Sequence, residues 1–113
     1  MFFLDYIWFV KIDFITHAKN TLNIIFEKIN NLEGDIEVDL VENNLNIELG
    51  DQRIFIVSIH EPTKQIWLSS PISGAHHFNS IDDDNIIWES TRNSGIYLLD
   101  IIFKELRECT DEN

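Results

Sequence analysis

Apolar residues in the first third of the chain recur at three- and four-residue steps, which is the spacing of one face of an amphipathic helix. This face consists of Phe14, Ala18, Leu22, Ile25, Ile29 and Leu32. The same register runs backwards through Val10, Ile7 and Phe3, which predicts a helix that begins near residue 3 rather than near Asp13. Gly34 can supply a left-handed C-cap, so we expect the helix to end near it.

The period of the apolar residues changes to two after Gly34. Asp and Glu alternate with Ile, Val and Leu over residues 35–40, which is typical of a half-buried strand. Further alternating or β-rich runs occupy residues 45–49, 53–60, 64–70, 75–79 and 85–90. Turn signals lie between them at Asn43-Asn44, Gly50-Asp51, Pro62, Pro71, Gly74 and the aspartates 82–84. Connections this short predict an antiparallel sheet of about six strands within residues 35–90.

The helical period returns near the end of the chain. Asn93 or Ser94 can cap a helix over residues 95–108, and residues 110–113 are expected to form a frayed tail. The apolar stripe of this helix is Leu99, Ile102, Phe103 and Leu106. The order helix, strands, helix predicts an α+β two-layer sandwich in which both terminal helices cover one face of the sheet.

Composition narrows the possible functions. The 113 residues fit one domain spanning 1–113, and the single Cys109 excludes an intramolecular disulfide or a cysteine-based zinc site. A net charge of -12 argues against binding to nucleic acids, which are polyanions, and favours cations or a basic protein face. The apolar run 1–10 is too short to span a bilayer and fits neither a secretory signal nor a transit peptide. We expect residues 1–12 to be an N-terminal extension that belongs to the first helix.

No sequence pattern marks a covalent catalytic site. The four histidines at 17, 60, 76 and 77 include no helical i, i+4 pair, and neighbours such as His76 and His77 point to opposite sides of a strand. We therefore interpret the histidines as surface residues. The serines lack a nucleophile-elbow context, and no glycine-rich phosphate loop is present.

The acidic strand and Trp67 are the two candidate sites. Asp35, Glu37 and Asp39 share one strand face at a spacing of roughly 7 Å, which suits weak binding of a hard cation rather than a closed cage. The alternative is a solvated face that keeps the protein soluble. Alternation with Ile66 turns Trp67 outward, where it can serve as an interaction hot spot, unless a loop or the N-terminal run covers it.

The residues around Trp67 also carry a family resemblance. The run Pro62-Thr-Lys-Gln-Ile-Trp-Leu-Ser-Ser-Pro-Ile-Ser-Gly74 resembles the frataxin signature Pro-x-Lys-Gln-Ile-Trp-Leu-Ser-Ser-Pro-x-Ser-Gly. The resemblance extends through residues 22–32, the acidic strand, Trp88 and the helix 95–106. It implies an iron-binding protein that docks on the cysteine desulfurase and scaffold complex and modulates iron–sulfur cluster synthesis. The Ser-Ser-Pro form is similar to mitochondrial and alphaproteobacterial members, so we expect a mitochondrion or related organelle, with a bacterial cytoplasm as the alternative.

The resemblance also implies the site residues. Weakly bound iron, as Fe²⁺ or Fe³⁺, is expected at Glu27, Glu33, Asp35, Glu37, Asp39 and Glu42. Partner contacts are expected at Ser58, Gln65, Trp67, Ser69 and His77. We expect the protein to act as a monomer.

Several positions depart from the family pattern. The acidic ridge of the first helix is thinned to Glu27, since the other matching positions are Thr16, His17, Lys19, Asn20 and Asn23. The usual Asn-Lys-Gln is Ser58-Ile59-His60, and the residues after Gly74 include Ala75, His77 and Asn79. Ferroxidase activity, which is assigned to some eukaryotic members, is the alternative to a non-enzymatic regulator. An acidic protein-binding module without metal is a third hypothesis.

Overall fold

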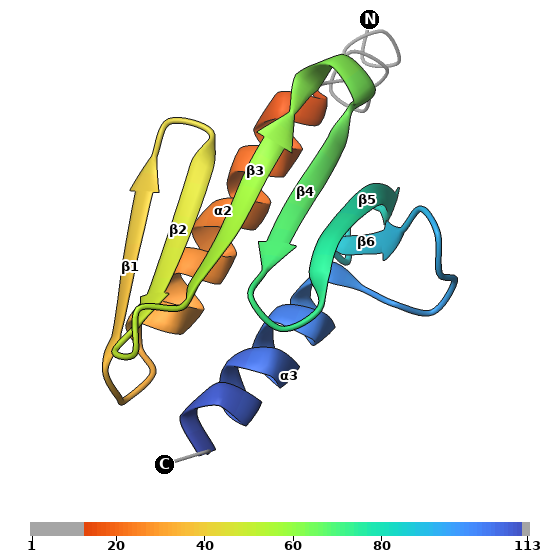
Figure 1. Ribbon diagram of the computed structural model, residues 1–113. Coiled ribbons are helices and arrows are strands. Elements are labelled where there is room, and N and C mark those ends of the chain that lie inside the picture. The colour runs from red at the N-terminus through yellow and green to blue at the C-terminus, as the bar shows by residue number, and fades with distance from the viewer. Residues whose placement is uncertain (1–12, 112–113) are drawn as a thin grey trace, which may run out of the picture.

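The computed structural model describes residues 13–111, in the order helix, six strands, helix (Figure 1). The main elements are α2 (Phe14–Asn30), β1 (Ile36–Val41), β2 (Asn44–Leu49), β3 (Ile54–His60), β4 (Gln65–Ser70), β5 (Gly74–Asp82), β6 (Ile87–Ser90) and α3 (Leu98–Asp111). A short 3₁₀ turn, η1 (Glu61–Thr63), joins β3 to β4. The predicted α+β sandwich is confirmed.

The six strands pair only with their neighbours in sequence, in the order β1-β2-β3-β4-β5-β6, and every pair is antiparallel. Short connections fix this meander. The first turn consists of Glu42 and Asn43 rather than the predicted Asn43-Asn44, because Asn44 already pairs with Val41. Glu42 takes the positive φ of 55° that this turn requires.

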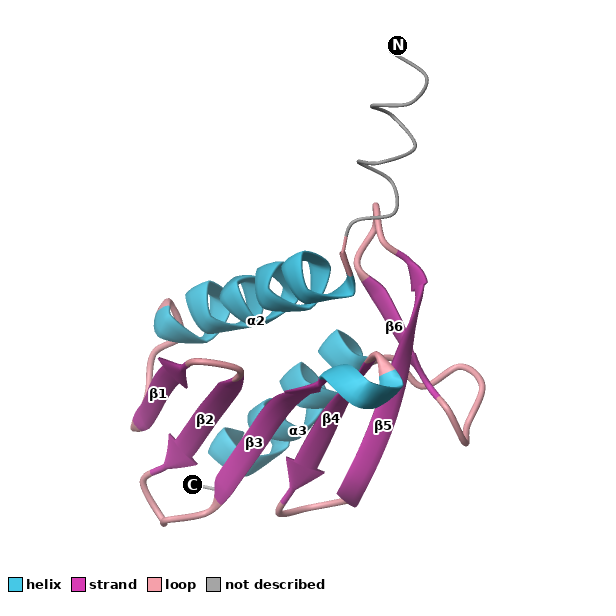
Figure 2. Ribbon diagram, turned by 90° about the horizontal axis from the view of Figure 1, so that it is seen from above, coloured by secondary structure: helices cyan, strands magenta, loops and turns pink. Residues whose placement is uncertain are grey.

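Both helices cover one face of the sheet, and the other face is open (Figures 1 and 2). Side chains on the covered face are buried, and they alternate with exposed or half-buried ones along β2, β3 and β4. The core therefore lies between the sheet and the helices, as the period-two pattern predicted. Its largest fully buried side chains are Trp88, Phe55, Phe78, Leu22, Ile25, Leu45, Ile47, Ile66, Leu68, Leu98, Ile102 and Leu106.

The ends of α2 differ from the prediction. Asp13 has a φ of 112°, so a continuous helix through this residue is wrong, and residues 1–12 lie outside the described part. The helix ends at Asn30, with Asn31 as its C-cap, and Gly34 lies in the following loop at φ 127°. Leu32 consequently leaves the helical face and is 47% exposed.

Helix α3 begins at Leu98, later than predicted. The backbone N–H groups of Arg92 and Asn93 donate to Ser90 Oγ, and Tyr97 forms a β-bridge with Glu89. The chain is thus held in a turn and an extended segment where a cap at 93 or 94 was expected. At the other end, residues 110 and 111 are helical, and residues 112 and 113 of the expected tail lie outside the described part.

Buried polar groups in the described part are paired. The indole N–H of Trp88 donates to Thr21 Oγ1 at 2.9 Å, and Ser70 Oγ donates to Glu105 Oε1 at 2.6 Å. Among residues 13–110 no buried side-chain N or O atom lacks a hydrogen-bond partner. None of the described helices is both long enough and apolar enough to cross a membrane.

Candidate functional site

The open face of the sheet brings together the residues expected to contact a partner. Ser58 lies opposite Trp67 in the β3–β4 ladder, and His77 lies opposite Trp67 in the β4–β5 ladder. Gln65 and Ser69 flank Trp67 on β4 by alternation. The five residues therefore share one surface across three strands.

Trp67 faces away from the core, as alternation predicted. Its neighbours Ile66 and Leu68 are 0% and 1% exposed, whereas Trp67 is half-buried. Ile54 and Ile56 on β3 are exposed large apolar side chains that alternate with the buried Phe55. A partly exposed indole on the same sheet face as exposed isoleucines is the composition expected of an interaction surface.

The indole of Trp67 lies between two imidazole rings. The ring of His60 stacks on it at a centroid distance of 3.8 Å and an interplanar angle of 16°. The ring of His77 stacks on it at 4.3 Å and 11°. The indole N–H donates to Gln65 Oε1 at 2.9 Å. This arrangement, which we call the three-ring stack, consists of His60, Trp67 and His77.

Sequence reasoning missed the three-ring stack, because it treated all four histidines as separate surface residues. His76 and His77 do point to opposite sides of β5, as predicted. His76 hydrogen-bonds to Ser73 Oγ at 2.8 Å, and His77 stacks on Trp67. The signal that could have found the stack is the pairing register, which places His77 opposite Trp67 once the β4–β5 turn is known.

His17 also makes more side-chain contacts than its position in the sequence indicated. Its position corresponds to the acidic ridge of the helix, yet its ring stacks on Trp88 at a centroid distance of 4.9 Å and an interplanar angle of 10°. Its Nε2 atom hydrogen-bonds to Ser80 Oγ at 3.1 Å and lies 3.4 Å from Asp83 Oδ1. The side chain is only 14% exposed, so it belongs to the boundary of the core rather than to a solvated ridge.

The six carboxylates expected to hold iron are all exposed, and they are distributed over several elements. Glu37 and Asp39 lie on β1, where Glu37 is paired with Glu48 of β2 and Asp39 with Asn46. Asp35 precedes β1 rather than lying in it. The others lie on α2 (Glu27), in the loop before β1 (Glu33) and in the β1–β2 turn (Glu42).

No closed metal centre is formed by these acids. Among residues 13–111 no group of three or more His, Cys, Asp or Glu side chains is placed to hold one ion. Glu37 and Glu48 nevertheless lie opposite each other in the ladder, and a cation would reduce the repulsion between these like charges. The edge formed by β1 and β2 therefore fits a weak and labile cation better than a fixed ligand set.

Two carboxyls outside this group have altered acidity. Hydrogen bonds from Arg53 hold the pKa of Asp51 below its usual value. Hydrogen bonds from the side chain and backbone of Asn85 likewise lower the pKa of Asp82. Asp51 is exposed and Asp82 is partly exposed, so both serve local turn geometry at the ends of strands rather than a buried site.

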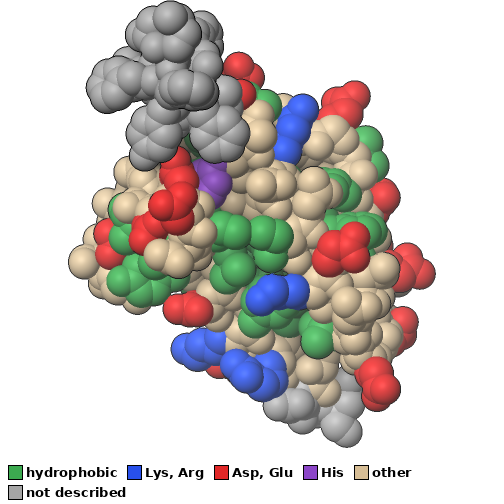
Figure 3. Space-filling view, turned by 180° about the vertical axis from the view of Figure 1, so that it is seen from behind, with side chains coloured by type: hydrophobic (Ala, Val, Ile, Leu, Met, Phe, Trp, Pro, Cys, Tyr) green, Lys and Arg blue, Asp and Glu red, His purple; other side chains and the backbone are tan. Residues whose placement is uncertain are grey.

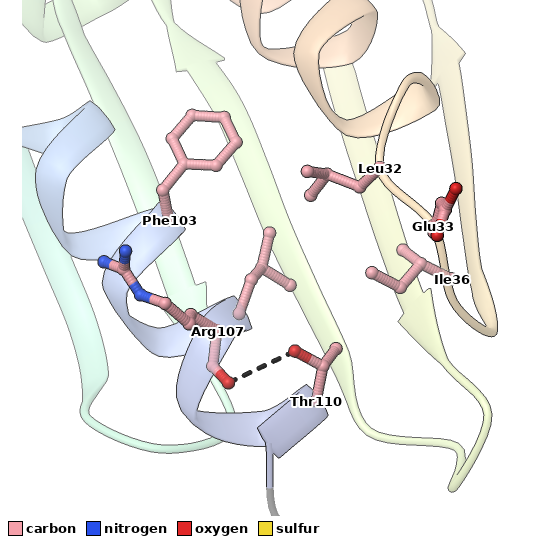
Figure 4. A pocket seen from close by; sticks show the side chains of 7 residues that line it. Leu32, Glu33, Ile36, Phe103, Arg107 and Thr110 are labelled. Carbon is pink, nitrogen blue, oxygen red and sulfur yellow. Dashed lines mark hydrogen bonds between the residues drawn. The ribbon is translucent and has the colours of Figure 1, made fainter.

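On the opposite side of the molecule, hydrophobic side chains gather between the two helices (Figure 3). A hollow of about 280 Å³ lies there, with Leu32 and Ile36 facing Phe103 across it (Figure 4). Arg107 and Glu33 lie at its rim. This hollow is separated from Trp67 by the sheet, so it is not part of the open-face site.

Comparisons with known proteins show which proteins the chain is similar to. A family described as the frataxin-like domain matches residues 9–112. The chain is 33% identical over 107 residues to a mitochondrial frataxin-like protein of Leishmania donovani, covering 88% of this chain and 56% of that protein. It is 32% identical over 83 residues to the iron–sulfur cluster assembly protein CyaY of Thioalkalivibrio sulfidiphilus, covering 72% of this chain and 76% of that protein.

A solved structure is similar as well. The trimeric frataxin of Saccharomyces cerevisiae, described as complexed with ferrous iron, superposes with a TM-score of 0.73 and 26% identity. The match covers 84% of this chain and 86% of that chain. The chain thus spans nearly all of a structural relative, although it spans little more than half of the L. donovani protein.

Proposed function

The chain belongs to the family of frataxin-like domains, and from this premise we propose that it is an acidic iron-binding protein that modulates iron–sulfur cluster assembly. It acts by docking on the complex of cysteine desulfurase and scaffold protein, and it can deliver Fe²⁺ there. The T. sulfidiphilus relative is an iron–sulfur cluster assembly protein, which supports the pathway. The ferrous iron of the yeast structure supports the metal.

The observation that carries the docking proposal is the open sheet face around Trp67. A sheet with helices on one side leaves its second face to solvent or to a partner. Here that face carries Trp67, Ile54 and Ile56 with polar Gln65 and Ser69 beside the indole. An apolar centre within a polar surround is the usual anatomy of a binding hot spot.

Iron is best understood as cargo held at the acidic edge. Carboxylates bind hard cations through oxygen and water, and loosely spaced ones bind them weakly. Glu37 and Asp39 share the outer side of β1, with Glu48 directly across from Glu37. A cation there reduces the repulsion between these charges, so it should stabilise the folded state.

A regulator is favoured over an iron-oxidising storage enzyme. Oxidation of iron requires a site where carboxylates and histidines converge on the metal. The described residues contain no group of three such side chains around one point. Iron-dependent oxygen consumption measures the alternative directly, and a rate above that of free Fe²⁺ would favour the ferroxidase.

For the compartment we propose a mitochondrion or related organelle, with a bacterial cytoplasm as the alternative, and for the free protein a monomer.

The docking test compares Trp67→Ala with the unchanged protein in a cysteine desulfurase assay that contains the scaffold. We expect the unchanged protein to alter the rate and Trp67→Ala to lose that effect while its melting temperature stays close to the original. Ile72→Ala is the matched control, because Ile72 is an exposed apolar residue in the β4–β5 turn and stands at a variable position of the signature. Loss of stability in step with loss of the effect would show that Trp67 is a core residue.

The iron test is a thermal melt with and without Fe²⁺ under anaerobic conditions. We expect the metal to raise the midpoint, and the double change Glu37→Gln with Asp39→Asn to remove most of the rise. Glu61→Gln with Asp84→Asn is the control, since it removes the same charge from exposed positions elsewhere. An equal rise in both double variants would place the metal away from β1.

A further inference from the structure

The three-ring stack leaves little of the Trp67 indole available for face-on contact. His60 covers one face at 3.8 Å and His77 covers the other at 4.3 Å, and both rings lie nearly parallel to the indole. Two stacking partners on one side of the same ring would clash, so the imidazoles lie on opposite sides. The indole N–H is already bonded to Gln65 Oε1. What remains of Trp67 for a partner is the C–H edge of the ring.

The stack is built into the strands rather than formed by chance between mobile side chains. Its members come from β3, β4 and β5, and Trp67 is register-paired with His77. The ring of His60 is held at its Nδ1 atom by Thr63 Oγ1 at 2.7 Å, in the η1 turn that follows β3. The hydrogen bond to Thr63 therefore limits the rotation of the His60 ring, and the ladder pairing places His77 directly beside Trp67.

We propose that His60 and His77 are positioning residues that clamp Trp67, so that the partner meets a row of three ring edges instead of an open indole face. This inference rests on the docking role proposed above and specifies its chemistry. The edges of aromatic rings carry partial positive charge.

The row of edges selects for acceptor oxygens. A partner segment that places backbone carbonyl or carboxylate oxygens against the stack meets ring C–H edges of matching polarity. A guanidinium or a proline ring, which would pack on the face of a free indole, finds both faces occupied. The specificity of the site therefore comes from the histidines as much as from Trp67.

The first experiment measures the stack in the free protein, without a partner. Acrylamide quenching of Trp67 fluorescence is isolated by subtracting the signal of the matching Trp67→Phe protein. We expect Trp67 to be shielded in the unchanged protein and in His60→Phe/His77→Phe, which keeps both rings, and clearly more accessible in His60→Ala/His77→Ala. Equal quenching in all three would overturn the clamp.

The second experiment measures binding of the same proteins to the cysteine desulfurase and scaffold complex. We expect His60→Ala/His77→Ala to bind about tenfold more weakly, because the indole loses two ring contacts that fix its orientation. The Phe/Phe protein should recover most of this loss. His76→Ala is the matched control, since His76 adjoins His77 but lies off the stack, and it should bind as the unchanged protein does.

Unchanged or tighter binding by the Ala/Ala protein would show that the partner uses the indole faces, and it would overturn the proposal. A Phe/Phe protein as weak as Ala/Ala, with its fold intact by circular dichroism, would overturn it too. If the unchanged protein does not bind the complex at all, the proposed function and the edge-on recognition that rests on it both fail. The quenching result would then still establish whether the histidines shield the indole.

Discussion

Ser70 offers a sharp test of how the motif around Trp67 divides between stability and binding. Its hydroxyl donates to Glu105 Oε1 of α3 at 2.6 Å and accepts the backbone N–H groups of Ile72 and Ser73 at 2.9 and 3.1 Å. Ser70 is 8% exposed and Glu105 is 5% exposed. The Ser70 hydroxyl therefore links α3 to the sheet and stabilises the β4–β5 turn. Ser69, next to it, is exposed on the open face.

The change Ser70→Ala removes all three contacts without adding bulk. Leaving a buried carboxyl group without its partner costs about 1–3 kcal/mol, and more if the group is charged. The backbone N–H groups of Ile72 and Ser73 can donate to water instead, so the loss of these two hydrogen bonds adds little to the cost in stability. We therefore expect Ser70→Ala to lower the free energy of unfolding by about 2–3 kcal/mol, a large share of the roughly 5–15 kcal/mol of a typical domain. Ser69→Ala should change it by less than about 0.5 kcal/mol.

Urea unfolding followed by circular dichroism measures both variants. With a slope of about 1.5 kcal/mol per molar urea, a loss of 2 kcal/mol moves the midpoint down by roughly 1.3 M. A double-mutant cycle with Glu105→Gln then isolates the Ser70–Glu105 contact, since the two residues touch and their effects should not add. A midpoint for Ser70→Ala within 0.3 M, or roughly 0.5 kcal/mol, of the original would refute this reasoning, and so would an equal loss in Ser69→Ala.

Three further predictions follow from other contacts. Trp67→Ala should weaken the binding free energy of docking by about 2 kcal/mol or more. It should lower the free energy of unfolding by less than the roughly 3–5 kcal/mol expected for truncating a buried tryptophan. Calorimetry measures the loss of stability and a binding assay measures the loss of affinity, and equal losses would contradict this prediction. Thr21→Val leaves the Trp88 indole N–H buried without its acceptor, so unfolding in urea should show a loss of about 1–3 kcal/mol, and an unchanged midpoint would contradict this. The lowered pKa values of Asp51 and Asp82 mean that their contribution to stability is present above pH 3.8, the unfolded value, and is lost as the pH falls through the lower folded values. Acid unfolding of Asp51→Asn and Asp82→Asn should accordingly lose stability less steeply below pH 3.8 than the unchanged protein does.

The layer arrangement could be predicted from the sequence because burial imposes a period. Residues 14–29 repeat at helical steps, and residues 36–70 alternate, so each segment specifies which side faces the core. Element ends were less predictable, because they depend on competing hydrogen bonds. Leu32 continues the apolar register of α2, yet the helix stops at Asn30. The start of α3 depends on Ser90, whose hydroxyl captures two backbone N–H groups of the preceding turn.

The site was predictable residue by residue but not as an assembly. Alternation alone placed Trp67, Gln65 and Ser69 on the open face. It could not place His60 against Trp67, because that contact is diagonal between strands and depends on the η1 turn. The carboxylates could not be assembled into a site from the sequence either. Their residue types suggested a metal site, but the distances between them depend on the fold, which places them on α2, on β1 and in the loops.

Alternate residues of the six-residue strand β4 point to opposite faces of the sheet, so one set serves the core and the other the open face. Ile66, Leu68 and Ser70 point inward, where two fill the core and the third binds α3. Gln65, Trp67 and Ser69 point outward, where nothing in the fold requires a tryptophan. A large apolar ring is costly on a solvated face, and the flanking imidazoles reduce that cost by removing its faces from water. The free protein can therefore keep Trp67 ready for a partner without exposing its whole surface. Inward substitutions on β4 should accordingly be detected by unfolding, and outward ones by binding.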